Sequence, residues 1–207
     1  MLGQQIRAWE VLDDRILGVL GRTQREHFVP EAYHDLAFAD MEIPLAHDQQ
    51  MMAPKLEGRL LQSLGLQSED AVLEVGTGSG FLTACLAGLA DTVLSVDIFS
   101  DFTVGAGKRL DEMAIRNVEL RTEDAFNLSA PEQFDAIAVT GSVPELDEHF
   151  IQMLRPGGRL FVIVGRPPVM DTLLLTLHDT GKWTQESLFE TVVPPLLNAA
   201  RPEPFVL

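Results

Sequence analysis

Residues 73–81 read LEVGTGSGF, and a second apolar stretch at residues 93–97 reads VLSVD. The first stretch combines a short apolar strand with glycines at every second position. Gly76 allows a sharp turn off the strand, Gly78 lets a ligand approach the backbone, and Gly80 lets a helix begin close to the sheet. The pattern therefore predicts a strand, a glycine loop and a helix in that order.

Asp97 ends the second apolar stretch, 17 residues after Gly80. At this distance, a carboxylate at the end of the second strand can accept hydrogen bonds from two ribose hydroxyls. The free N–H groups at the start of the helix favour an anionic group on the same ligand. Together these features predict a nucleoside-binding site.

The remaining sequence predicts an α/β fold, with buried strands alternating with helices. We expect strands at Ala71–Val75, Thr92–Val96, Val118–Leu120, Phe134–Val139, Arg159–Val164, Leu173–Leu177 and Ser187–Val193, and helices at Phe81–Ala90, Phe102–Ile115 and Val143–Leu154. The short link between the last two strands implies an antiparallel hairpin. The prediction is a doubly wound, Rossmann-like sheet of seven mostly parallel strands, with an antiparallel C-terminal hairpin.

The N-terminal part has a different pattern and is predicted to be a helical extension. Apolar residues between Ile6 and Leu20 recur at helical spacing, and Thr23 begins a capping-box pattern for a second short helix. Residues 32–54 look irregular, and Leu56–Leu64 resumes helical spacing. We therefore expect an extension with a substrate-side loop over residues 1–65, and a ligand-binding domain over residues 66–207.

Composition excludes several classes of function. With 15 basic and 31 acidic residues the net charge is −16, which disfavours binding to nucleic acid or to an anionic membrane surface. The chain has no apolar run long enough to span a bilayer, and residues 1–15 do not resemble a signal peptide, so we expect a cytoplasmic protein. The five histidines and the single cysteine, Cys85, have no metal-ligand spacing, so no metal is expected.

The spacing of the glycines distinguishes between two cofactors. Dinucleotide-binding enzymes have G-x-G-x-x-G, whereas this loop is G-x-G-x-G preceded by Glu74. This form resembles motif I of S-adenosylmethionine (AdoMet) methyltransferases, whose product is S-adenosylhomocysteine. The residues predicted to bind this cofactor are Glu74, Gly76, Thr77, Gly78, Gly80, Asp97, Ile98, Asp124 and Ala125.

The whole chain resembles the protein-L-isoaspartate O-methyltransferase family. REHFVPEAY at residues 25–33 resembles the family's R-E-x-F-V-P-x-x-Y, and IPLAHDQ at 43–49 resembles P-I-G-x-G-Q. FDAIAVT at 134–140 resembles F-D-A-I-x-V-T, and ETVVPPL at 190–196 resembles the C-terminal strand of the family and its F-V-P-L.

This resemblance implies methyl transfer to a carboxylate of isoaspartyl residues in damaged protein. The methyl group of AdoMet is already electrophilic and a carboxylate is already ionised at neutral pH, so no general base is needed. Alignment of the reacting atoms in a water-free site then supplies most of the catalysis. The implied partner is a protein or peptide carboxylate, and the sequence makes no prediction of an oligomeric state.

The substrate loop departs from the family pattern. The family continues T-I-S-x-P, and its serine orients the substrate carboxylate, whereas this chain has Gln50 and Met52 at the threonine and serine positions. We expect Gln50, the Met52 position and Thr140 to form the catalytic side of the site, with His47 and Gln49 in the substrate loop.

Three interpretations follow from this departure. Isoaspartyl methylation is retained, with Gln50 or backbone N–H groups in place of the serine. Alternatively, the AdoMet site is retained and the acceptor is a more apolar one, or the chain is a non-catalytic AdoMet-binding interaction protein. The apolar tail at Phe205-Val206-Leu207 could dock on the domain or on a partner.

Overall fold

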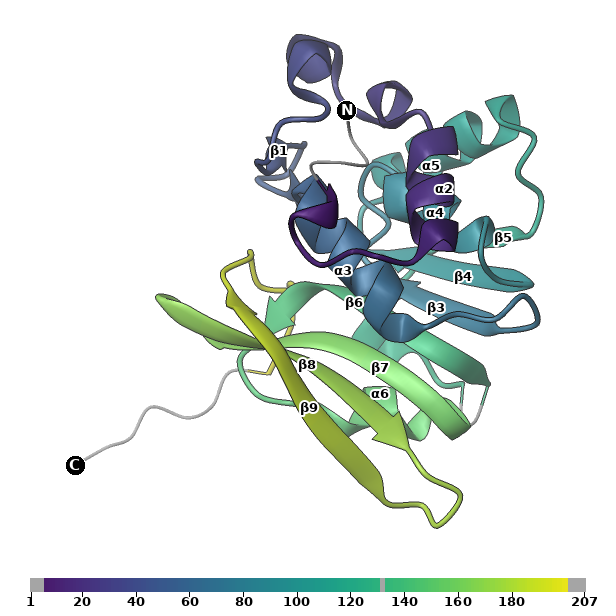
Figure 1. Cartoon of the computed structure of the whole chain (residues 1–207), viewed down its shortest axis with the longest axis vertical. Coiled ribbons are helices and arrows are strands. Elements are labelled where there is room, and N and C mark those ends of the chain that lie inside the picture. Colours follow the sequence, from purple (N-terminus) through teal and green to yellow (C-terminus); the bar gives the residue numbers. More distant parts are fainter. Residues whose placement is uncertain (1–5, 131–132, 201–207) are drawn as a thin grey trace.

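The computed structural model describes residues 6–130 and 133–200. Its centre is a seven-stranded sheet in the order β5-β4-β3-β6-β7-β8-β9 (Figure 1). The strands are β3 (Ala71–Val75), β4 (Thr92–Asp97), β5 (Val118–Thr122), β6 (Phe134–Val143), β7 (Leu154–Arg166), β8 (Val169–Leu177) and β9 (Trp183–Thr191). The pairs among β5, β4, β3, β6 and β7 are parallel, and β8 and β9 are antiparallel. The predicted fold class is confirmed.

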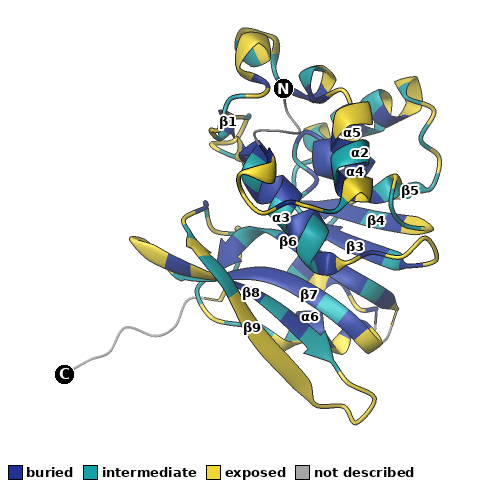
Figure 2. Cartoon of the chain, in the orientation of Figure 1, coloured by how far each residue is buried: buried dark blue, intermediate teal, exposed yellow. Residues whose placement is uncertain are grey.

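Two hydrophobic clusters cover the two faces of the sheet. One face packs against the N-terminal segment and the helices α2, α3, α4 and α5, and the other against α6 and the chain near residues 125–130. The helices are α2 (Asp14–Arg22), α3 (Pro54–Leu64), α4 (Phe81–Ala87), α5 (Ser100–Glu112) and α6 (Glu148–Gln152). Figure 2 shows the resulting pattern, with buried central strands and a largely exposed β9. The alternation of side chains along each strand explains why both faces are apolar.

Short elements complete the N-terminal segment. They are the 3-10 helices η1 (Arg25–Phe28) and η2 (Glu31–Leu36) and the hairpin of β1 (Ile43–Pro44) and β2 (Gln50–Met51), with a further 3-10 turn, η3 (Ala125–Asn127), later in the chain. In β1–β2, Ile43 pairs with Met51 and Pro44 with Gln50. The segment that looks irregular in the sequence is therefore a short ordered hairpin, too brief to show an alternating pattern.

Three sequence-based expectations about helices are wrong. The expected helix from Ile6 to Leu20 is interrupted at Glu10, whose φ is +63°, and α2 begins only after Asp13, whose carboxylate accepts from the Arg15 N–H. Thr23 caps the C-terminal end of α2, because its N–H donates to the Val19 carbonyl, and it does not begin the next helix.

The third difference lies at residues 143–154. There β6 continues to Val143, and the helix is only the five residues of α6. Ser142 explains the longer strand, because its N–H donates to the Pro194 carbonyl at 3.0 Å and its carbonyl accepts from the Leu196 N–H at 2.8 Å. This pairing with the C-terminal segment keeps the chain extended.

The N-terminal extension and the sheet share one core. The larger cluster joins Ile6, Leu20 and Leu60 to Val72 and Phe161. The boundary near residue 65 therefore separates two patterns of sequence within one packed unit. The apolar tail at residues 205–207 lies outside the described residues. None of the described helices has both the length and the apolar character required to cross a membrane.

Candidate functional site

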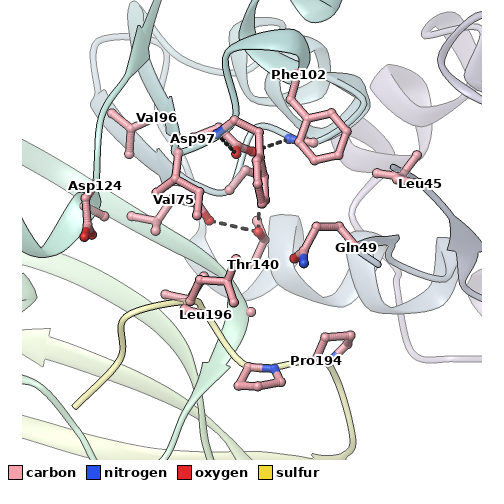
Figure 3. A pocket seen from close by; sticks show the side chains of 18 of the residues that line it. Leu45, Gln49, Val75, Val96, Asp97, Phe102, Asp124, Thr140, Pro194 and Leu196 are labelled. Atoms are coloured by element: carbon pink, nitrogen blue, oxygen red, sulfur yellow. Dashed lines mark hydrogen bonds between the residues drawn. The ribbon is translucent and has the colours of Figure 1, made fainter. Parts of the chain in front are cut away.

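A cavity of about 750 Å³, including its open mouth, lies at the carboxyl ends of β3, β4 and β6. In doubly wound sheets this edge is where ligands bind. Figure 3 shows Leu45 and Gln49 on one side of the cavity and Asp124 on the opposite side, with Asp97 and Thr140 between them. The lining residues are Leu45, Gln49, Gln50, Val75, Gly76, Gly78, Val96, Asp97, Ile98, Phe99, Phe102, Glu123, Asp124, Ala125, Phe126, Thr140, Gly141, Pro194, Pro195, Leu196 and Leu197.

The glycine loop is held against the end of β4. Gly76, with φ of +98°, donates from its N–H to the Val96 carbonyl at 2.8 Å, and a side chain at this position would overlap Thr140 Oγ1. Gly78, with φ of +49°, lines the cavity. Both glycines are favoured by a left-handed backbone, and Gly76 also by the close approach of Thr140.

Asp97 lies at the base of the cavity and holds two backbone segments. Its Oδ2 accepts from the Gly78 N–H at 2.9 Å and its Oδ1 from the Phe99 N–H at 3.0 Å. Burial raises the pKa of Asp97, and these two hydrogen bonds oppose the shift because they favour the ionised form. Each carboxylate oxygen has a further lone pair, so the group can still accept from a ligand hydroxyl.

Glu74 does not line the cavity. Its side chain is fully buried, where Oε2 accepts from Thr83 Oγ1 and, at 2.6 Å, from Ser95 Oγ. Burial raises the pKa of Glu74 to about 8. The expectation that Glu74 contacts the cofactor is therefore wrong for its side chain, because side chains alternate along β3 and Val75 is the residue that faces the cavity.

Thr77 and Gly80 also lie beneath the loop surface. Thr77 is buried and its Oγ1 is 2.7 Å from Ser95 Oγ, which extends the network around Glu74. A Cβ on Gly80 would lie 2.8 Å from the Ala106 Cβ, so glycine here allows α4 and α5 to pack closely. These two residues shape the loop without lining the cavity.

Three residues predicted to bind the cofactor, Ile98, Asp124 and Ala125, line the side of the cavity opposite the hairpin. Asp124 Oδ1 accepts from the Phe126 N–H at 3.0 Å, and Oδ2 accepts from Asn198 Nδ2 at 2.9 Å. The carboxylate is thus held in place at the cavity wall and retains acceptor capacity.

Three of the predicted acceptor-side residues meet at the cavity. Gln49 and Gln50 come from the β1–β2 hairpin, and Thr140 from β6. Thr140 Oγ1 donates to the Val75 carbonyl at 2.8 Å, so its oxygen is left as an acceptor toward the cavity. The two glutamines are the amide donors on this side.

Met52 does not reach the cavity. Its side chain is buried in the core, and its carbonyl accepts from Arg25 Nη2 at 2.7 Å. Arg25 is itself buried, pairs with Glu57 and donates from Nε to the Ala37 carbonyl at 2.7 Å. Position 52 in this chain is therefore an anchor for the hairpin, and the expectation of a catalytic-side residue there is wrong.

His47 lies beside the cavity but does not line it. Its ring stacks on Phe99, with centroids 4.0 Å apart, and its Nε2 lies 3.0 Å from each carboxylate oxygen of Asp101. Its contacts are with the chain itself, so the structure does not place His47 against an acceptor.

Sequence reasoning missed two groups of lining residues. Phe99 and Phe102 follow Asp97, and an aromatic residue after a strand carries no distinctive signal by itself. Residues 194–197 reach the cavity only because Ser142 pairs with that segment, which is a long-range contact that local patterns do not reveal.

Neither a metal site nor a reactive cysteine is found among the residues that the structure describes. Residues 6–130 and 133–200 contain no cluster of three or more histidine, cysteine, aspartate or glutamate side chains able to hold a metal ion. Cys85 is buried and its pKa is raised by burial, so it is a core residue.

Comparisons with solved structures agree with the fold. A protein-L-isoaspartate O-methyltransferase from Plasmodium falciparum, solved in complex with S-adenosyl-L-homocysteine, has a TM-score of 0.80 at 19% identity, covering 94% of this chain and 96% of that one. Another protein-L-isoaspartate O-methyltransferase has a TM-score of 0.81 at 22% identity, covering 94% of this chain and 64% of that one.

Comparisons of sequence identify the family. A curated protein-L-isoaspartate O-methyltransferase from Syntrophus aciditrophicus is 37% identical over 191 residues, covering 91% of this chain and 88% of the relative. Another, from Rhodopseudomonas palustris, is 33% identical over 209 residues, covering 99% of this chain and 96% of the relative. The family model described as protein-L-isoaspartate(D-aspartate) O-methyltransferase matches residues 1–198. The chain therefore belongs to the protein-L-isoaspartate O-methyltransferase family.

Proposed function

We propose that this protein transfers a methyl group from AdoMet to the carboxylate of isoaspartyl residues in damaged proteins and leaves S-adenosylhomocysteine. The observation that carries the proposal is one continuous cavity that joins the Asp97–Gly78 pair to Gln49 and Gln50. One part of this cavity suits a nucleoside and the other an anionic acceptor. Relatives at 32–37% identity that carry this enzyme name support the same activity.

The cofactor side has groups that suit AdoMet. The ribose hydroxyls of AdoMet would donate to the remaining lone pairs of Asp97, and its adenine amino group would donate to Asp124. Gly78 supports this assignment, because it lines the cavity with a left-handed backbone and its N–H holds Asp97. When bound, AdoMet supplies a methyl group that is electrophilic because it is attached to a sulfonium.

The acceptor side requires orientation and no proton transfer. A substrate carboxylate has an ordinary pKa near 4 and is ionised at neutral pH, so the chain needs no general base to activate it. The side-chain amides of Gln49 and Gln50 can donate to this carboxylate and hold one oxygen toward the methyl group. Gln50 takes the place of the serine that the family uses, since Met52 is buried in the core.

Other acceptors and a non-catalytic role are not favoured. The whole chain, and not the glycine loop alone, matches enzymes of this one activity. The acceptor proposed is thus a protein or peptide, and the cytoplasmic location expected from the sequence stays a prediction. The net charge of −16 favours a partner other than nucleic acid.

The chemical nature of the product tests this proposal. The protein is incubated with methyl-labelled AdoMet and an isoaspartyl peptide, and the product is then treated with mild base. We expect label in the peptide that base releases as volatile methanol, because a carboxyl ester is the only linkage expected to be hydrolysed so easily. Base-stable label in the peptide would contradict carboxyl methylation. An unlabelled peptide, with protein that is shown to bind S-adenosylhomocysteine, would contradict turnover.

A further inference from the structure

The turn of the β1–β2 hairpin is attached to the start of α5 by one side chain. The His47 ring lies parallel to the Phe99 ring, with centroids 4.0 Å apart and an interplanar angle of 4°, and meets Phe102 edge-on at 5.6 Å. His47 Nε2 also lies 3.0 Å from both carboxylate oxygens of Asp101, 54 residues away in sequence. His47 therefore contacts three residues of one segment at once.

The two phenylalanines are part of the cavity. Phe99 and Phe102, which we call the aromatic wall, meet each other edge-on at 5.7 Å and line the cavity, whereas His47 lies behind them. The Phe99 N–H donates to Asp97 Oδ1, so the aromatic wall is continuous with the carboxylate proposed to bind the ribose. A ligand in contact with Asp97 and the aromatic wall would thus restrict the surface on which His47 stacks.

The backbone of the same turn orients an acceptor-side amide. His47 and Asp48 both have left-handed conformations, with φ of +58° and +55°, which are uncommon for residues other than glycine. The His47 carbonyl accepts from Gln49 Nε2 at 2.9 Å. The position of the His47 backbone therefore sets the direction of a side chain that lines the cavity.

We propose that His47 is a positioning residue that couples the acceptor-side hairpin to the cofactor side of the cavity. The aromatic wall transmits the coupling: cofactor bound against it holds His47, and His47 holds Gln49 ready for the acceptor. Cofactor and acceptor then strengthen each other's binding by the same factor. The assignment of the two sides rests on the proposed function.

Stacking is the contact that carries the coupling. The His47–Asp101 pair is exposed at both side chains, by 39% and 58%, and such pairs contribute little. The aromatic contact joins a residue of the hairpin to two residues that line the cavity. A His47→Phe variant retains a ring for stacking and loses the pair, and a His47→Gln variant retains a polar group and loses the ring.

Hydrogen exchange tests the coupling without any acceptor. Exchange in fragments that cover residues 43–53 is measured in the full chain, with and without saturating S-adenosylhomocysteine. We expect the ligand to slow exchange in the wild type and in His47→Phe, and to have no effect on these residues in His47→Ala and His47→Gln. Equal protection in all four proteins, or none in the wild type, would overturn the proposal.

Binding measurements provide the second test. The affinity for S-adenosylhomocysteine is measured by calorimetry with and without an isoaspartyl peptide. We expect the peptide to raise this affinity by about fivefold or more in the wild type and in His47→Phe, and to leave it unchanged in His47→Ala.

The control for both tests is His178→Ala, which removes another exposed histidine with one side-chain partner, Thr184, from the β8–β9 end of the sheet. We expect this variant to behave as the wild type. Retained coupling in His47→Ala would overturn the proposal even if the wild type methylates the peptide. If the wild type binds no isoaspartyl peptide, the proposed function fails, and the exchange experiment still decides the role of His47.

Discussion

The backbone N–H of Gly78 donates to the Asp97 carboxylate at 2.9 Å, which joins the glycine loop after β3 to the end of β4. The same carboxylate accepts from the Phe99 N–H at 3.0 Å. The group proposed to bind the ribose therefore also holds the loop and the aromatic wall in place. The site is therefore assembled before a ligand binds, so binding costs less conformational entropy of the loop and side chains.

Removal of the Asp97 carboxylate tests its role in binding. We expect Asp97→Ala to weaken S-adenosylhomocysteine binding by about 1.5–3 kcal/mol, the range for hydrogen bonds to a charged group. Calorimetry measures the effect, and Asp171→Ala, which removes an exposed carboxylate on β8, is the matched control. Equal affinity in Asp97→Ala and the wild type would contradict the ribose assignment.

The buried carboxyl of Glu74 predicts a dependence of stability on pH. Its pKa is raised to about 8 in the folded protein, above its ordinary value of 4.5, so the folded state holds a proton that the unfolded state has lost. Stability contributed by this group is present below pH 4.5 and falls as the pH rises toward 8, by at most about 1.4 kcal/mol per pH unit.

A Glu74→Gln variant isolates this effect, because the amide is neutral at every pH and its oxygen can still accept from Thr83 and Ser95. We expect urea unfolding between pH 6 and 8 to show a smaller loss of stability in Glu74→Gln than in the wild type. The same slope in both proteins would mean that Glu74 is ionised in the folded state.

The close contact of Gly76 with Thr140 predicts that an added methyl group is not tolerated. In Gly76→Ala the Cβ would overlap Thr140 Oγ1, and the residue would also keep a φ of +98°. We expect a loss of about 3 kcal/mol or more, from the left-handed backbone together with overpacking, and weaker S-adenosylhomocysteine binding. Gly21→Ala, in α2 with open space around it, should be neutral or stabilising in the same thermal unfolding and calorimetry experiments. A fully stable, ligand-binding Gly76→Ala protein would contradict this account of the loop.

The buried position of Met52 predicts that restoring the family's serine does not restore a catalytic hydroxyl. We expect Met52→Ser to reduce the free energy of unfolding by about 2–5 kcal/mol, as for other truncations of buried side chains, without faster methyl transfer. Met41→Ser is the control, since Met41 is 40% exposed. If Met52→Ser were as stable as the wild type and faster on isoaspartyl peptide, the hydroxyl would have to reach the cavity.

Much of the fold can be predicted from local sequence patterns. The glycine loop, Asp97 and the five parallel strands follow from apolar runs and special backbone requirements that lie within a few residues of one another. Other features depend on contacts between distant segments. The length of β6 depends on Ser142 pairing near residues 194–196, and the break before α2 depends on the left-handed Glu10.

The direction of individual side chains was harder to predict than the position of the site. Glu74 lies in the motif, but the alternation of β3 turns its carboxylate toward Thr83 and Ser95 and away from the cavity. Met52 lies in the substrate loop, yet its side chain is buried in the core and Arg25 donates to its backbone carbonyl. In both cases the competing interaction comes from a residue distant in sequence, Ser95 for Glu74 and Arg25 for Met52, and a motif does not show which side chains will meet.

Selectivity between two peptides tests the central claim most directly. Initial rates of methyl transfer are measured for an isoaspartyl peptide and the matched aspartyl peptide, with the wild type and with Gln50→Ala. The account predicts a much higher kcat/KM for the isoaspartyl peptide in the wild type, and a lower value for that peptide in Gln50→Ala. Equal kcat/KM for the two peptides in the wild type would contradict it.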